Sequence, residues 1–104
     1  MNVTIRRYES IDQSRKSELI KQLDENLLPT LSELPGFNGY SVIDAGEGVM
    51  TSVSFFDTQA QADESTRVAA SWLREQKLDA VLSTAPKIAS GQVVVHKTRE
   101  LVQA

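Results

Sequence analysis

The sequence predicts an α+β domain of the ferredoxin-like type, a βαββαβ sandwich with a four-stranded antiparallel sheet and two helices on one face. Segments rich in β-branched and aromatic residues indicate strands at 2–8, 37–45, 49–56 and 92–98. Apolar residues at helical spacing indicate helices within 10–29 and 57–76. Because only the strands can bury the helical stripes, both helices must pack on the sheet.

Length and composition indicate one domain over residues 1–104. Apolar residues make up 40% of the chain and charged residues 24%, a balance typical of a folded protein. The net charge is −3 with both signs interspersed, which argues against a nucleic-acid partner. Without a signal peptide or a run of ~18 apolar residues, we expect a cytoplasmic chain and no membrane contact. The absence of cysteine excludes disulfides, thiolate metal sites and cysteine nucleophiles.

The first predicted helix has signals at both ends. Its stripe is formed by Leu19, Ile20, Leu23 and Leu27. Asp12 alone, or Ser10 together with Gln13, fits an N-cap. Pro29 is expected to end the helix, and a capping box in 30–33 fits one further turn.

The second half of the chain begins with a hairpin. Gly46 and Gly48 supply the positive φ angles that a tight turn needs between the second and third strands. Thr58 and Gln61 then fit a capping box at the start of the second helix. Its stripe is formed by Ser65, Val68, Ala69, Trp72, Leu73 and Gln76. Gly91 is expected to release the chain into the final strand, "QVVVHKT".

Alternation divides the strand residues into two sets. The apolar set, which suits the helices, comprises Val3, Ile5, Val53, Phe55, Val93 and Val95. The mixed set comprises Thr4, Arg6, Tyr8, Ser52, Ser54, Phe56, Val94 and His96. The mixed set is too apolar for free solvent and too polar for a core. We therefore expect it to form the open face of the sheet and to self-associate there, enclosing a cavity between two sheets.

Four features carry a resemblance to a known family. They are "LPGFNGY" before the second strand, "GEGVMTSVSFFDTQAQADES" from the third strand into the helix, the Trp72 helix, and Pro86 followed by Gly91-Gln92-Val93. Together they resemble the antibiotic biosynthesis monooxygenase-like family of the dimeric α+β barrel superfamily. The resemblance covers nearly the whole chain, but it lies in hydrophobic and turn positions rather than in a catalytic signature.

The resemblance implies a homodimer whose sheets pack through their open faces into a barrel. It also implies a pocket between the sheet and the helices of each subunit. Active members of the family are cofactor-independent oxygenases of aromatic polyketide-like phenols, or haem-degrading enzymes. We therefore expect a second copy of this chain and a small aromatic ligand as partners, and no cofactor.

Arg6 and Tyr8 are the first candidate site residues. They lie two residues apart on one strand face, so both side chains can point into one cavity, and Tyr40 can join them. A phenol hydroxyl and a cation beside a developing phenolate would suit oxygenase chemistry. The alternative interpretation is that they are ordinary polar residues of the interface.

Trp72 and His96 are the remaining candidates. Similar proteins use a tryptophan near this place to contact substrate, whereas the apolar stripe around Trp72 favours a core position. His96, the single histidine, fits a general base or an axial haem ligand, or else a polar residue of the sheet or interface. In haem-degrading relatives the ligand histidine lies on a helix, and this chain has none there.

No other catalytic pattern stands out in the sequence. Asp57, Asp63 and Glu64 are explained by helix capping and the helix dipole, and no metal spacing or phosphate loop is evident. The catalytic candidates are therefore Arg6, Tyr8, Trp72 and His96. Two functions stay open: an oxygenase that uses the substrate's own phenolate or carbanion to activate dioxygen, and a non-catalytic ligand-binding or structural homodimer. Haem breakdown is the third.

Overall fold

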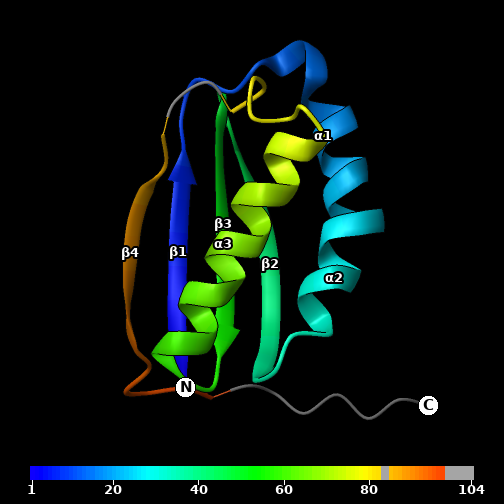
Figure 1. Ribbon diagram of the computed structural model, residues 1–104. Coiled ribbons are helices and arrows are strands. Elements are labelled where there is room, and N and C mark those ends of the chain that lie inside the picture. The colour runs from blue at the N-terminus through cyan, green and yellow to red at the C-terminus, as the bar shows by residue number, and fades with distance from the viewer. Residues whose placement is uncertain (83–84, 98–104) are drawn as a thin grey trace, which may run out of the picture.

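The computed structural model describes residues 1–82 and 85–97. Its sheet contains β1 (Asn2–Tyr8), β2 (Phe37–Gly46), β3 (Val49–Phe56) and β4 (Lys87–Gln92) in the order β2-β3-β1-β4. All neighbouring strands are antiparallel. The helical segments lie on one face of the sheet (Figure 1). The predicted ferredoxin-like fold is therefore confirmed.

The first helical segment is continuous from residue 13 to residue 32. It consists of η1 (Gln13–Arg15), α1 (Lys16–Gln22), the π-helical turn η2 (Leu23–Leu27) and α2 (Leu28–Ser32). Asp12 caps its start, since its side chain accepts the backbone N–H of Ser14 at 3.0 Å. Within the described residues no helix is long and apolar enough to span a bilayer.

The prediction that Pro29 ends this helix is wrong. In a regular α-helix the proline ring would clash with the carbonyl four residues before it, and that carbonyl would lose its hydrogen bond. Here the turn before Pro29 is wide, with the backbone N–H of Leu28 bonded to the carbonyl of Leu23. The capping box predicted in 30–33 is also absent, because Thr30 Oγ1 instead donates to the carbonyl of Asn26 at 3.0 Å.

The wide turn also keeps a row of leucines together. Residues spaced by four drift around an α-helix by about 40° per step, because a turn holds 3.6 residues. A single turn with an extra residue offsets this drift. As a result one face carries Leu19, Leu23, Leu27 and Leu31, and all except the half-buried Leu23 are at most 2% exposed.

The hairpin and the second helix follow the sequence closely. Glu47 and Gly48 have φ angles of 53° and 80°, as a two-residue turn between β2 and β3 requires. Helix α3 (Gln59–Glu75) begins with the predicted capping box between Thr58 and Gln61. Both predictions are confirmed.

The predicted strand over 92–98 is wrong, because β4 ends at Gln92. The last residues to pair between β4 and β1 are Gln92 and Asn2. Only Met1 precedes Asn2, and its carbonyl accepts a hydrogen bond from the Val93 N–H at 2.8 Å. Pairing therefore ends before Val94, despite the β-branched sequence. His96 consequently follows the last strand instead of lying in the middle of it, as predicted. Thr98 lies outside the described residues.

The two faces of the sheet are reversed relative to the prediction. The members of the mixed set on β1 and β3 face the helices: Thr4 and Arg6 are 5% and 6% exposed, whereas Ile5 of the apolar set is 38% exposed. Phe56, predicted to face a partner, is fully buried and packs edge-on against Phe37 with 5.7 Å between ring centroids. The buried guanidinium donates hydrogen bonds to hydroxyl groups. These hydrogen bonds offset the free-energy cost of burying polar groups, which was the reason for predicting that this face is open.

The open face of the sheet accordingly carries a cluster of apolar side chains. Its side chains include Val3, Ile5, Ile43, Val53 and Phe55. Ile5 lies opposite Val53 and Val3 lies opposite Phe55, so these side chains form one patch. Ile43 is 49% exposed. Exposed apolar patches of this kind mark interaction surfaces.

Candidate functional site

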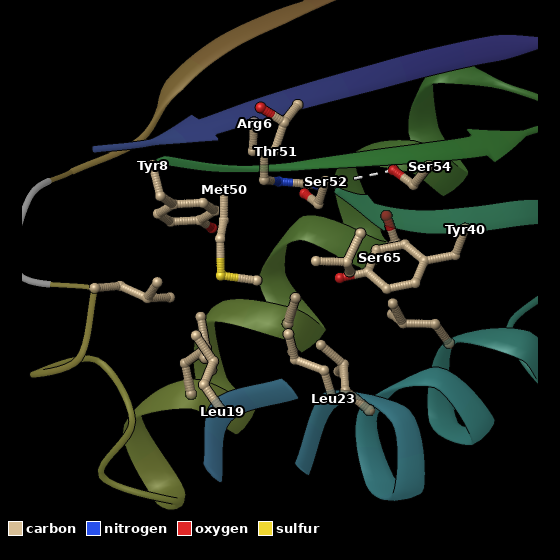
Figure 2. A pocket seen from close by; sticks show the side chains of 16 residues that line it. Arg6, Tyr8, Leu19, Leu23, Tyr40, Met50, Thr51, Ser52, Ser54 and Ser65 are labelled. Atoms are coloured by element: carbon tan, nitrogen blue, oxygen red, sulfur yellow. Dashed lines mark hydrogen bonds between the residues drawn. The ribbon is translucent and has the colours of Figure 1, made fainter. Parts of the chain in front are cut away.

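A small cavity lies between the helix-facing side of the sheet and the helices. It has a volume of about 40 Å³ and is called the inner cavity below. The sheet contributes its polar side, and the helices contribute mainly leucines (Figure 2). Its lining consists of Arg6, Tyr8, Leu19, Leu23, Leu27, Leu31, Tyr40, Val42, Met50, Thr51, Ser52, Ser54, Ser65, Ala69, Leu73 and Leu82.

Arg6 is the charged group of the inner cavity. Its guanidinium donates through Nη1 to Ser54 Oγ at 3.5 Å and through Nη2 to Thr66 Oγ1. Within the described residues, no carboxylate forms an ion pair with Arg6, although five such pairs occur elsewhere. Burial lowers the pKa of Arg6 below its ordinary value, and the neighbouring Tyr8 and Tyr40 oppose this shift. The cavity thus contains a positive charge that only neutral groups surround.

Two phenols line the cavity beside this charge. Figure 2 shows the ring of Tyr8 on one side of Arg6 and the ring of Tyr40 on the other. Burial raises the pKa of Tyr8, and Arg6 partly offsets the rise. Burial raises the pKa of Tyr40 to about 12, against the effects of Arg6 and of a hydrogen bond with Ser52. Both phenols therefore stay protonated near neutral pH and can donate a hydrogen bond to an anion.

Hydroxyl groups complete the polar side of the site. Ser52, Ser54 and Ser65 are at most 6% exposed. Thr66 accepts from Arg6 and donates to the carbonyl of Ala62 at 3.2 Å. Among the described residues no buried side-chain nitrogen or oxygen lacks a hydrogen-bond partner. The groups are therefore held in place before any ligand binds.

Two open grooves adjoin the inner cavity. The α1–β2 groove has a volume of about 330 Å³ and is lined by Ile20, Lys21, Leu23, Asp24, Leu28, Tyr40, Val42, Asp44 and Met50. A second hollow of about 410 Å³ between α3 and β4 shares Arg6 and Tyr8 with the inner cavity. An ion pair between Lys16 Nζ and Asp44 Oδ2 at 3.0 Å joins the start of α1 to β2 beside the first groove.

The other two candidates lie outside the inner cavity. Trp72 is partly buried and packs against the core cluster that contains Leu19 and Met50, as the core interpretation expected. His96 is exposed and its ring lies 6.1 Å from that of Phe55, on the open face of the sheet. The structure thus brings Arg6 and Tyr8 together and separates Trp72 and His96 from them.

Sequence reasoning finds only part of the site. It includes Tyr40, but not the contributions of Met50, Ser65 and Thr66. Ser65 stands in the apolar stripe of α3, and a serine at such a position is a signal that the stripe faces something polar. Within the part of the chain that the structure describes, no cluster of histidine, aspartate or glutamate suits a metal ion.

Comparisons with known proteins add information on the fold. No family model matches the chain, and no curated protein matches it. Three similar solved structures are a monooxygenase from Streptomyces coelicolor in complex with nanaomycin D, a point mutant of MhuD with two manganese protoporphyrin IX bound per active site, and a dimeric ferredoxin-like protein from an uncultured marine organism.

The overlap with each of these structures is nearly complete. The monooxygenase is 13% identical with a TM-score of 0.72, and the match covers 95% of this chain and 92% of that one. The MhuD mutant is 18% identical with a TM-score of 0.74 and coverage of 95% and 100%. The dimeric protein is 16% identical with a TM-score of 0.70 and coverage of 95% and 92%. These identities are low, so the comparisons establish the ferredoxin-like fold alone for this chain.

Proposed function

We propose that this chain is a homodimeric member of the antibiotic biosynthesis monooxygenase-like family that binds a small aromatic substrate as its phenolate and oxidises it with dioxygen. The buried Arg6 carries this proposal. A charge that is removed from water and has no carboxylate beside it is costly, and an anionic ligand would compensate it. Tyr8 and Tyr40 flank the same position with phenol groups that stay protonated.

The cavity favours the ionised form of a phenol. Arg6 stabilises negative charge on the substrate oxygen, and the two tyrosine hydroxyls donate to it, so the pKa of a bound phenol falls. The leucines on the helix side provide the apolar surface against which a ring can lie. Binding thereby supplies an electron-rich phenolate without a protein base.

The reaction then needs only dioxygen as co-reactant. One electron passes from the phenolate to dioxygen, and the resulting superoxide and substrate radical combine to form a peroxide at the ring carbon para to the oxygen. That carbon loses its proton, the O–O bond breaks, and the ring becomes a quinone while the outer oxygen leaves as water. The substrate supplies all four electrons. Arg6 and the tyrosines bind and orient the anion throughout.

The homodimer in this proposal rests on the open face of the sheet. A second copy would cover the apolar patch around Ile5, Val53 and Phe55. The similar protein from a marine organism is a dimer. Burial of this patch in the dimer would leave the inner cavity, on the other side of the sheet, free for substrate.

Oxygen consumption tests the catalytic part. Purified protein is mixed with phenols and hydroquinones, and dioxygen uptake is compared with quinone absorbance and with ¹⁸O incorporation from labelled dioxygen. For a phenol we expect one dioxygen consumed and one labelled oxygen gained per quinone. If the enzyme increases dioxygen uptake with none of the phenols tested, the proposal is wrong.

A non-catalytic ligand-binding homodimer is the second candidate. It is favoured by the absence of any carboxylate or histidine from the described lining of the inner cavity, since neither tyrosine is a good base near neutral pH. This function predicts that phenolates bind in an Arg6-dependent manner while dioxygen uptake stays at the background rate. Binding and oxygen measurements on the same sample separate the two functions.

Haem breakdown does not fit the residues of this site. The single histidine, His96, lies beside Phe55 on the open face, away from the inner cavity. A hemin titration is expected to leave the Soret band unshifted.

A further inference from the structure

The inner cavity is too small to hold an aromatic ring as it stands. A buried water needs roughly 10–15 Å³ by this measure of volume, so about 40 Å³ corresponds to a few water molecules. Ligand pockets in proteins typically measure about 300–1,000 Å³. A ring that reaches Arg6 must therefore gain space from the surroundings of the cavity.

The α1–β2 groove offers that space. Its volume of about 330 Å³ is within the usual range for a ligand site. The groove and the inner cavity share Leu23, Tyr40, Val42 and Met50. Arg6 lines the inner cavity but not this groove, so a ligand in the groove alone would miss the charge.

Met50 occupies the boundary between the two spaces. It lies on β3, is 3% exposed, and its side chain extends from the sheet toward Leu19 and Leu23 on the helix side (Figure 2). Tyr40 carries a rigid aromatic ring, and Val42 is short and β-branched. Methionine has three rotatable bonds and adapts to irregular spaces, so among these side chains it can most easily change position.

We propose that Met50 is a specificity-determining residue: its rotation joins the inner cavity to the α1–β2 groove and sets the size of the ring system that reaches Arg6 from that groove. The inference rests on the proposed phenolate site. A one-ring phenolate needs a small displacement of the thioether, whereas a two-ring phenolate must occupy both spaces and needs the side chain to leave the boundary. Arg6 holds the anionic oxygen in both cases.

Two coloured anions of different size test this role. 4-Nitrophenol and 4-nitro-1-naphthol have acidic hydroxyl groups and absorb in the visible range as anions, so binding to the protein can be followed by spectrophotometric titration. The measured quantity is the ratio of their dissociation constants, which a general loss of stability does not change. Circular dichroism and solution mass confirm that each variant is folded.

Two different substitutions of Met50 should shift this ratio of dissociation constants in opposite directions. Met50→Ala removes the obstacle and should improve naphtholate binding relative to nitrophenolate by about tenfold. Met50→Ile keeps nearly the same volume but branches at Cβ and cannot swing aside, so it should weaken naphtholate binding relative to nitrophenolate by a similar factor. Ile11→Ala is the matched control, because Ile11 is buried in the same core cluster as Met50 but lines neither the inner cavity nor the groove. It should change the ratio by less than about threefold.

The outcomes separate the two proposals. If the wild-type chain binds neither anion, the phenolate site is wrong and the role of Met50 is wrong with it. If nitrophenolate binds in an Arg6-dependent manner but the ratio is the same in both Met50 variants, or Ile11→Ala shifts it as much as Met50→Ala, only the role of Met50 is overturned.

Discussion

Arg6 on β1 donates a hydrogen bond to the hydroxyl of Thr66 on α3, and thereby links the sheet to the helix from inside the cavity. The same hydroxyl donates to the carbonyl of Ala62 at 3.2 Å, so its orientation is fixed by both partners. The guanidinium is held by neutral groups on two elements, and its charge stays available for an anion. This relationship distinguishes the cavity from an ordinary core.

Arg6→Met should separate ligand binding from stability. Hydrogen bonds to a charged group contribute about 1.5–3 kcal/mol, so we expect nitrophenolate affinity to fall about 10- to 100-fold. The unfolding free energy should stay within about 1 kcal/mol of wild type, because removing an unpaired buried charge offsets the lost hydrogen bonds. Spectrophotometric titration and urea unfolding measure the two quantities.

Arg67→Met serves as the control for this change. Arg67 is on the same helix as Thr66, is exposed, and is paired with Glu64 at the surface. It should leave nitrophenolate affinity unchanged. Equal losses of affinity in the two variants would indicate a general charge effect and would contradict a specific role for Arg6.

The raised pKa of Tyr40 should lower the unfolding free energy at alkaline pH. Its pKa is about 12 in the folded chain, against about 10 for tyrosine in an unfolded chain. Above pH 10 the unfolded state loses this proton while the folded state keeps it, so the unfolding free energy decreases with rising pH. The slope approaches about 1.4 kcal/mol per pH unit for one such group. The raised pKa of Tyr8 adds to the decrease.

Tyr40→Phe should reduce this alkaline slope. Urea unfolding at several values between pH 8 and pH 11 gives the free energy at each pH. At pH 8 the variant should stay within about 1 kcal/mol of wild type, since only one hydroxyl group is removed. In the double variant Tyr8→Phe/Tyr40→Phe, the unfolding free energy should decrease even less with rising pH. A variant with the wild-type slope would show that Tyr40 keeps an ordinary pKa.

The sequence predicted the fold because its local signals agree with the tertiary structure. The glycines of the hairpin, the capping box of Thr58 and Gln61, and the alternation in β3 each favour one local conformation. The placement of Arg6 and Tyr8 on one strand face follows from the same alternation. By contrast, β4 ends where its partner β1 begins, at Asn2. The sequence of residues 92–98 contains no information about that position.

The orientation of the sheet could not be predicted from polarity alone. A face with Thr4, Arg6 and Ser54 looks unfit for burial only while its hydrogen-bond partners are unknown, and one of them, Thr66, lies 60 residues away from Arg6 on α3.

The open face should mediate dimerisation, and two isoleucines on neighbouring strands test this. Ile5 is on the open face and 38% exposed, whereas Ile88 pairs with Arg6, belongs to the opposite face and is 56% exposed. Light scattering should give a dimer for the wild type and for Ile88→Lys. Ile5→Lys should give a monomer, since a charge buried in an apolar interface is costly. A wild-type monomer at micromolar concentration would refute the interface.

Pro29 and the wide turn before it should be energetically coupled. Glu25 is exposed and lies in η2, between Leu23 and Leu27. Its deletion shortens the spacing of these two leucines from four residues to three, so the row of leucines fits a regular α-helix. The deletion alone should destabilise the chain by about 3 kcal/mol or more, since the proline ring again meets the carbonyl four residues before it. Combined with Pro29→Ala, the same deletion should recover most of that loss. Urea unfolding of both variants and of Pro29→Ala alone measures the coupling, and additive effects would exclude it.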